Sequence, residues 1–264
     1  MAVGPVSPLV LERYELKYLI PLSMVEPISR YVEMFCTMDY YSQISHDYYY
    51  TINSLYFDTP TGYFFRSKVD KTGRISMRVR SYGEGPKAPY FFEIKEKTGD
   101  FCKKRRGLVP IESWSQLFTD PDIPQTFDPS KSPHVASFLA LAHTFGSVPT
   151  ILTQYRRKAY LSTVDDYARV TFDRGLRCYP ETRYNVYPDD QAMINYDHPT
   201  TFEDPGMNII LELKCERKIP VWMVDLIRRF NLTRGAFSKF ESAMMDNYSK
   251  DDLSQFAYGR MSNI

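Results

Sequence analysis

The stretch LERYELKYLI, residues 11–20, places Arg13, Glu15 and Lys17 at alternate positions, separated by Tyr14 and Leu16. Side chains of a β-strand point in turn to its two faces, so this period of two predicts a strand with one charged face and one apolar face. The function of the sheet then depends on whether the charged face points to solvent or to the interior.

Four further segments repeat this alternation: Thr72–Ser81, Tyr90–Lys97, Tyr167–Leu176 and Asn208–Glu216. Over the five charged faces, Arg and Lys outnumber Glu and Asp. Because one Glu-x-Lys match means little and three on separate strands are more specific, we treat these faces as one candidate site. The repeated pairs are Glu15–Lys17, Glu93–Lys95 and Glu212–Lys214, beside Arg78–Arg80.

Segments with helical spacing separate the expected strands, and Trp222, Leu226, Ile227 and Phe230 form an apolar stripe on one of them. Antiparallel strands mixed with helices predict an α+β fold, an antiparallel β-barrel flanked by helices. Two Pro-rich surface stretches are too short to divide the core, so residues 1–264 are expected to form one domain with its core at about 11–248. The expected helices are Leu22–Phe35, Thr61–Val69, Pro133–Phe145, Pro220–Leu232 and Phe237–Tyr248, and the further strands are Tyr48–Phe57 and Thr150–Ser162.

The composition argues against a general polyanion-binding surface. The net charge is +1, so no overall field draws the chain toward nucleic acid or anionic lipid. The four cysteines show no paired or metal-ligand spacing, which predicts free buried thiols in a reducing compartment. No signal peptide or transmembrane segment is evident, so we expect a cytoplasmic protein without direct membrane insertion.

Two orientations of the charged faces are open. If they point outward, apolar faces fill the barrel in the ordinary way. If they point inward, they form a cationic tunnel and the helices cover the apolar faces. Crowded Arg and Lys side chains repel one another unless a polyanion such as triphosphate fills the space, and interspersed glutamates favour a divalent cation, Mn²⁺ or Mg²⁺. A tunnel also excludes nucleic acid duplexes.

The order and spacing of several motifs resemble the VTC (vacuolar transporter chaperone) catalytic domain, a polyphosphate polymerase of the triphosphate tunnel metalloenzyme superfamily. The resemblance spans roughly residues 11–248. It implies transfer of the γ-phosphoryl group of ATP to a growing polyphosphate chain, with Mn²⁺ or a similar ion, and with ATP and polyphosphate or pyrophosphate as partners. The motifs are Arg13–Tyr18, Ser54–Asp58, Arg78-x-Arg80, Glu93-x-Lys95, Tyr155–Arg157, Arg169-x-Thr171-x-Asp173, Glu212-x-Lys214 and Phe237–Phe240.

The resemblance also implies roles for individual residues, with Glu212 as the metal ligand. The residues expected to hold reacting phosphates are Lys17, Arg78, Arg80, Lys95, Arg157 and Arg169. Those expected to bind substrate or product are Lys104, Tyr155, Ser238 at the tunnel wall, Lys239, and Lys214, which is included on strand parity alone.

Some assignments stay open on alternation alone. The run Lys103–Arg106 is expected to contribute one inward residue, Lys104 or Lys103, and we take Lys104. Arg157 is preferred to Arg156 because it shares parity with Tyr155. Asp173 is expected to pair with a nearby Arg more readily than with a metal.

The sequence departs from the family pattern at the first strand. The superfamily typically opens with Glu-x-Glu-x-Lys, whereas this chain has Arg13-x-Glu15-x-Lys17, which favours one metal and weakens the case for a hydrolase. The membrane helices and regulatory domain of eukaryotic complexes are not seen here, so a free-standing, prokaryotic-type enzyme is expected, with any membrane-protein partner unknown. The alternatives are a triphosphatase acting on inorganic or nucleoside triphosphate, and a non-catalytic module that binds polyphosphate or inositol phosphate.

Overall fold

The computed structural model of the chain describes residues 10–69, 75–85, 89–98, 101–109, 114–120, 131–197, 206–216, 218–235 and 237–247. Strands and helices alternate in the first half, and long strands dominate the second. The strands are β1 (Val10–Ile20), β2 (Cys36–Met38), β3 (Tyr50–Asp58), β4 (Ile75–Tyr82), β5 (Tyr90–Thr98), β6 (Phe101–Val109), β7 (Val148–Ser162), β8 (Ala168–Pro180), β9 (Ile194–Asn195) and β10 (Ile209–Cys215). The helices are the short 3-10 helix η1 (Leu22–Met24), α1 (Val25–Val32), α2 (Tyr40–Ile44), α3 (Tyr63–Val69), α4 (Gln116–Thr119), α6 (Pro133–Phe145), α8 (Val221–Arg229) and α9 (Lys239–Asn247).

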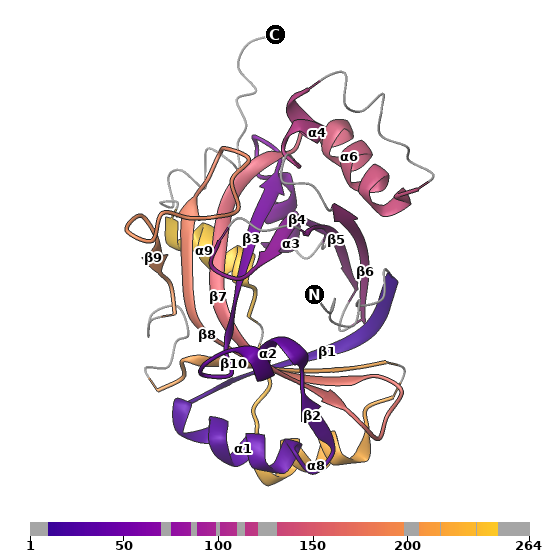
Figure 1. The fold of residues 1–264 in the computed structure, drawn as a ribbon, viewed down its shortest axis with the longest axis vertical. Coiled ribbons are helices and arrows are strands. Elements are labelled where there is room, and N and C mark those ends of the chain that lie inside the picture. The colour runs from indigo at the N-terminus through magenta and orange to yellow at the C-terminus, as the bar shows by residue number, and fades with distance from the viewer. Residues whose placement is uncertain are drawn as a thin grey trace.

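The long strands close into a barrel. The sheet runs β2-β7-β3-β4-β5-β6-β1-β10-β8-β9, and an additional pairing of β7 with β8 joins its two sides. The closed ring therefore has eight strands, all antiparallel to their neighbours, with β2 and β9 attached outside it. Figure 1 shows the ring nearly end-on. The predicted α+β fold, an antiparallel barrel flanked by helices, is confirmed.

Helices cover the apolar faces of the barrel strands on two sides. On one side, Ile28 of α1 and Trp222 and Leu226 of α8 pack against Leu16 of β1 and Leu213 of β10. On the other, α4 and α6 cover β3, β4 and β5, as Figure 1 shows. Burial of each large apolar side chain stabilises the fold by roughly 1.5–3 kcal/mol, so the apolar faces are fixed outward under the helices. The charged faces consequently point into the barrel, which is the tunnel orientation.

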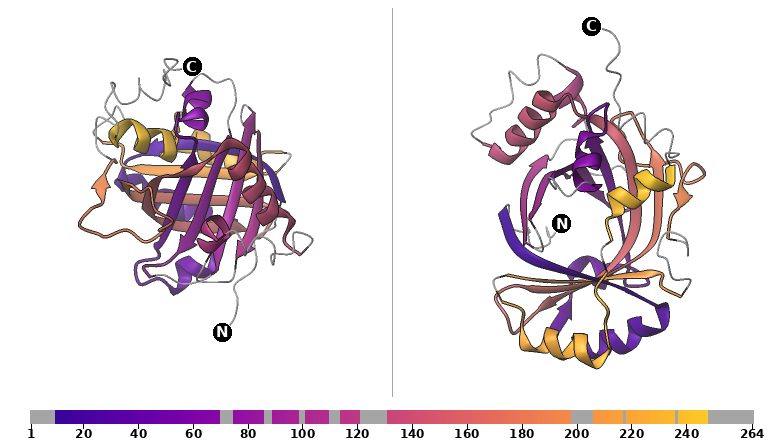
Figure 2. Two further views of the ribbon diagram at one scale, coloured as in Figure 1. Left: turned by 90° about the horizontal axis from the view of Figure 1, so that it is seen from above. Right: turned by 180° about the vertical axis from the view of Figure 1, so that it is seen from behind.

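The two ends of the barrel are covered differently. Tyr41 of α2 contacts Tyr50 at the start of β3 and Tyr82 at the end of β4. Phe240 of α9 contacts Tyr56 near the opposite end of β3. Figure 2 shows α9 in front when the molecule is viewed from behind, on the side opposite to α2 in Figure 1. The interior therefore has an α2 end and an α9 end.

Most expected elements are present with shifted boundaries. Helix α6 has the predicted bounds, whereas the first predicted helix is shorter and is preceded by η1, with Pro27 in the first turn of α1. Asp58 accepts backbone N–H bonds from Phe64 and Phe65 at the start of α3, as a capping residue does. All four cysteines are free and buried, as predicted. In the described part of the chain, no helix is both long enough and apolar enough to cross a membrane.

Candidate phosphate-binding interior

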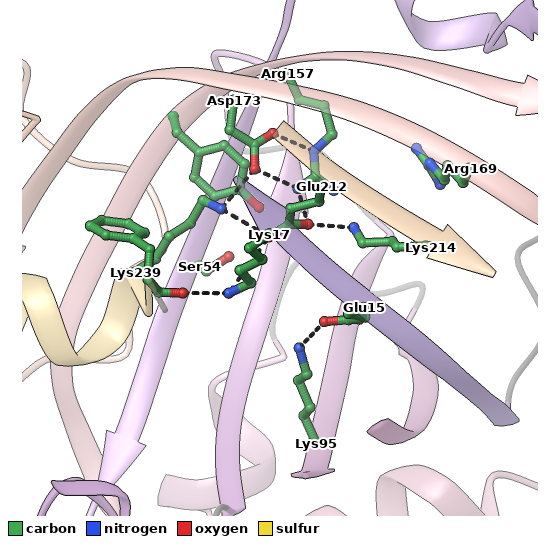
Figure 3. A network of polar contacts seen from close by, with 12 residues as sticks. Glu15, Lys17, Ser54, Lys95, Arg157, Arg169, Asp173, Glu212, Lys214 and Lys239 are labelled. Carbon is green, nitrogen blue, oxygen red and sulfur yellow. Dashed lines mark hydrogen bonds and ion pairs between the residues drawn. The ribbon is translucent and has the colours of Figure 1, made fainter. Parts of the chain in front are cut away.

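Glu212 of β10 is the centre of one group of charges in the barrel. Its carboxylate lies 2.6 Å from Lys214, 3.5 Å from Arg157, 3.5 Å from Lys239 and 3.8 Å from Lys17. These cations come from β10, β7, the start of α9 and β1, so the closed register of the strands brings them together (Figure 3). We call Glu212 and these four cations the Glu212 cluster.

Asp173 of β8 holds two of these cations in position. Arg157 donates through Nε and Nη2 to the two carboxylate oxygens of Asp173, at 2.6 and 2.7 Å. Lys239 lies 2.7 Å from the same carboxylate. Such a bidentate bond fixes the plane of the guanidinium group. The expected role of Asp173 as a partner for a nearby Arg agrees with this geometry.

Glu93 of β5 is the centre of a second group on the wall formed by β4, β5 and β6. Its carboxylate lies 2.7 Å from Arg78, 4.0 Å from Arg80, 2.5 Å from Lys104 and 2.8 Å from Arg106. The Glu93 side chain is only 1% exposed. We call Glu93 and these four cations the Glu93 cluster.

Tyrosine side chains contact the two groups, and one further set of ion pairs lies between them. Arg78 donates to the Tyr56 hydroxyl at 2.9 Å, and Arg80 donates to the Tyr155 hydroxyl at 3.1 Å. Between the walls, Glu15 accepts from Lys95 at 2.6 Å and also pairs with Arg13 (Figure 3). Lys239 lies over the Tyr155 ring at 4.7 Å, so the Tyr155 side chain contacts both clusters. We call the two clusters, these tyrosines and the Glu15 pairs the interior network.

Positive charge exceeds negative charge in this network. In the described part of the chain, ten Arg and Lys side chains make ion pairs with only four carboxylates, those of Glu15, Glu93, Asp173 and Glu212. Burial would raise the pKa of Glu93 and Glu212, but the surrounding cations hold both pKa values well below the usual range. Burial also lowers the pKa of Lys214 to about 7 and that of Lys17 to about 8. The crowded cations repel one another, and a bound polyanion would offset that repulsion.

The comparison with protein families identifies the domain. A family model of the VTC domain matches residues 12–247, nearly the whole described chain. The chain belongs to the VTC domain family. This confirms the resemblance drawn from the motifs, and together with the charged barrel it supports a triphosphate tunnel enzyme as the class of protein.

Other comparisons add less to the VTC domain assignment. A search of curated proteins found no match. Three solved structures align with most of the chain: a candidate adenylate cyclase from Bacillus halodurans (11% identity, TM-score 0.49, 92% of this chain and 100% of that one), the PH1819 protein of Pyrococcus horikoshii (12%, 0.46, 90% and 100%), and a candidate adenylyl cyclase of Hippeastrum described as having a dominant triphosphatase activity (15%, 0.41, 94% and 97%). Each TM-score is below 0.5, so the assignment depends on the family model.

The VTC domain brings most of the expected site residues into one interior. Arg169 pairs in the sheet with Lys214, but its side chain turns to the α2 end, where it donates to Asp39 at 2.9 Å and to the Tyr50 hydroxyl at 3.1 Å. Ser238 lies just before α9 and accepts the N–H of Glu241, as a helix-capping residue does. The residues that line the two clusters and the link between them are Lys17, Arg78, Arg80, Lys95, Lys104, Tyr155, Arg157, Glu212, Lys214 and Lys239.

Three cations were not among the expected site residues. The prediction that Lys103–Arg106 contributes one inward residue is wrong: Lys104 and Arg106 share a strand face, and both pair with Glu93. Arg13 lies on the same strand face as Glu15, so alternation in the first strand already indicated an inward side chain. Lys68 of α3 lies over the Phe240 ring at 4.5 Å, and burial lowers its pKa to about 8. It comes from a helix, where alternation gives no signal.

The fit of a divalent metal depends on the phosphate that would accompany it. No group of three or more His, Cys, Asp or Glu side chains that could hold a metal occurs among the described residues. Glu212 offers one carboxylate, and Mg²⁺ is commonly bound through one or two carboxylates plus substrate phosphates and water. Four cations already surround Glu212, so it could supply at most one ligand to a metal that takes its other ligands from a triphosphate and water.

Proposed function

We propose that this VTC domain is a metal-dependent polyphosphate polymerase that transfers the γ-phosphoryl group of ATP to a growing polyphosphate chain. The observation that carries the proposal is the excess of cations over carboxylates inside a closed barrel of the VTC family. A chain of phosphates matches such an interior, because each phosphate brings negative charge and several acceptor oxygens. The substrates are then ATP and polyphosphate or pyrophosphate.

In this phosphoryl transfer, the protein need not form a covalent bond to the substrate. The attacking group is the terminal oxygen of a phosphate chain, which is already anionic, so no Ser, Cys or His nucleophile is needed. Catalysis then consists of positioning the two phosphates and stabilising the charge that spreads over the transferred group. Arg78, Arg80 and Arg157 offer planar forks for phosphate oxygens, and Lys17, Lys95 and Lys239 offer point charges. Bound Mn²⁺ or Mg²⁺, held by Glu212, would neutralise charge on the β- and γ-phosphates.

Transfer is favoured over hydrolysis by the state of the acidic groups. Each of the four interior carboxylates is paired with at least two cations. A carboxylate so engaged is a poor base for activating water.

Incubation with ATP and Mn²⁺ followed by gel electrophoresis tests the proposal. Wild-type protein is expected to give a ladder of polyphosphate, and Arg78→Ala and Glu212→Ala are each expected to lower its rate by about 100-fold or more, the size of effect seen when one charge-stabilising group is removed. Arg30→Ala is a matched control, because Arg30 is 76% exposed on α1.

The other outcomes separate the competing functions. Orthophosphate without a ladder would mean a triphosphatase. Binding of tripolyphosphate without any turnover of ATP would mean a non-catalytic module. Either result would contradict the polymerase assignment.

A further inference from the structure

A cluster of aromatic rings lies at the α2 end of the barrel and has no role in the proposed reaction. The Tyr41 ring is stacked on the Tyr82 ring, with centroids 5.9 Å apart and an interplanar angle of 8°. Tyr50 packs against both rings, and Phe91 meets Tyr82 edge-on. Tyr40 and Tyr41 are each 40% exposed, whereas Tyr50 is buried, so the rings lead from the surface toward the interior.

Arg106 connects these rings directly to the charged interior. Its guanidinium lies 3.9 Å from the centre of the Phe91 ring and donates to the Tyr82 hydroxyl at 2.5 Å. The same guanidinium donates through Nε to Glu93 at 2.8 Å. One side chain therefore contacts both the aromatic cluster and the Glu93 cluster. A ligand that extends from one to the other would need an anionic part and a flat, stacking part.

We propose that Tyr41 stacks the base of the nucleoside triphosphate, whose phosphates extend past Arg106 into the Glu93 cluster. The inference rests on the proposed function, because it assumes that the interior holds a nucleoside triphosphate. Aromatic side chains bind bases of any sequence through their ring faces, and Arg adds a cation–π contribution. Tyr41 is the ring on this path that combines stacking geometry with a partly exposed side chain.

The opposite end of the barrel is unsuited to a base. There, Phe240, Ala243 and Met244 of α9 are buried against Tyr155 and Ile210 of the barrel. Those side chains are at most 2% exposed. The α2 end thus receives the nucleoside, and the terminal phosphate points toward the α9 end.

Binding measurements that compare ATP with inorganic tripolyphosphate test this inference. Isothermal titration calorimetry in EDTA avoids metal-dependent turnover. The two ligands differ by the nucleoside and by one ionisable oxygen, so each variant is compared with wild type for each ligand separately. Tyr41→Ala is expected to weaken ATP binding about tenfold, the lower part of the range for loss of one stacked base, and to leave tripolyphosphate binding within about twofold. Tyr41→Phe keeps the ring and is expected to restore ATP affinity. Tyr63→Ala is the control, because Tyr63 is 48% exposed on α3 and stacks on Phe145 of α6, on the outer face of the barrel and away from the charged interior.

The contrary outcomes are distinct. The inference is overturned if Tyr41→Ala leaves ATP binding unchanged, if it weakens both ligands equally, or if wild-type protein binds tripolyphosphate and not ATP. Wild-type protein that binds neither ligand in EDTA, and that also makes no polyphosphate from ATP and Mn²⁺, would overturn the proposed function together with this inference.

Discussion

The two walls of the barrel interior hold their central carboxylates with different cations. Three arginines and one lysine surround Glu93, whereas three lysines and one arginine surround Glu212. Arginine stays charged at any physiological pH and presents a rigid fork, while lysine is a mobile point charge whose pKa responds to burial. The Glu93 wall therefore presents mainly planar forks, and the Glu212 wall mainly point charges.

In the proposed reaction, one phosphate chain is held while another grows, so the two walls would hold the two chains by different means. A fixed set of forks favours one geometry of the bound triphosphate. The ammonium groups are point charges without a preferred plane, and burial lowers the pKa of two of them, Lys17 and Lys214, to about 8 and about 7. The following predictions test how far the two walls differ.

The largest expected effect is on stability, from neutralising Glu93 at the centre of its wall. Glu93→Gln leaves four buried cations without their shared partner, so the free energy of unfolding is expected to fall by about 3–5 kcal/mol, as when one member of a buried ion pair is removed. Urea unfolding followed by circular dichroism measures this loss. Glu96→Gln on the same strand is the control, because the Glu96–Arg105 pair is partly exposed and such pairs contribute about 0–1 kcal/mol. Equal effects of the two substitutions would show that Glu93 does not organise its wall.

Exchanging the two kinds of cation is expected to have a smaller, unequal effect. Arg78→Lys loses the simultaneous bonds from Arg78 to Glu93 and the Tyr56 hydroxyl, so kcat/KM for ATP is expected to fall about 100-fold. Lys239→Arg keeps a charge near Asp173 and Glu212, and the expected loss is about tenfold or less. Steady-state kinetics measures both values. If the lysine exchange costs more than the arginine exchange, the proposed distinction between the walls is wrong.

The smallest expected effect concerns Lys68, a cation that lies on neither wall. Burial lowers its pKa in the folded protein to about 8, below the ordinary value of 10.5. Between about pH 8 and pH 10.5 the unfolded chain binds more protons at this site, so the free energy of unfolding rises with pH through this window. The stability of the wild type relative to Lys68→Met should therefore increase from pH 7 to pH 10. Arginine stays charged, so the stability of Lys68→Arg relative to Lys68→Met should not change with pH over this range. If the stability of the wild type relative to Lys68→Met also does not change with pH, Lys68 is exposed to water.

Alternation in the sequence predicted much of the interior, because neighbouring strands of a barrel share their inward faces. The parity of Glu15 and Lys17 places both residues in the network, and the same holds for Glu93 and Lys95. Arg106 was missed although it has the parity of Lys104. The expectation allowed only one inward residue from that run, whereas a strand of nine residues presents several.

Other features depend on contacts that no local pattern contains. Helix α2 has five residues, too few for an amphipathic period, and it was not predicted. Its place is set by distant partners, including Tyr82 and the Asp39–Arg169 ion pair. Arg169 shares parity with Asp173, but its pairing with Asp39 separates it from Glu212. Parity gives the face of a strand and not the position along the barrel.

The place of β10 in the ring has a consequence for how the protein is made. This strand is the last of the barrel to leave the ribosome, and it lies between β1, the first strand, and β8. Until Ile209–Cys215 is synthesised, β1 and β8 each lack a neighbour, and the nascent chain exposes both edges. Pairing residues so distant in sequence slows folding, so closure of the barrel is expected to be a late and slow step after translation.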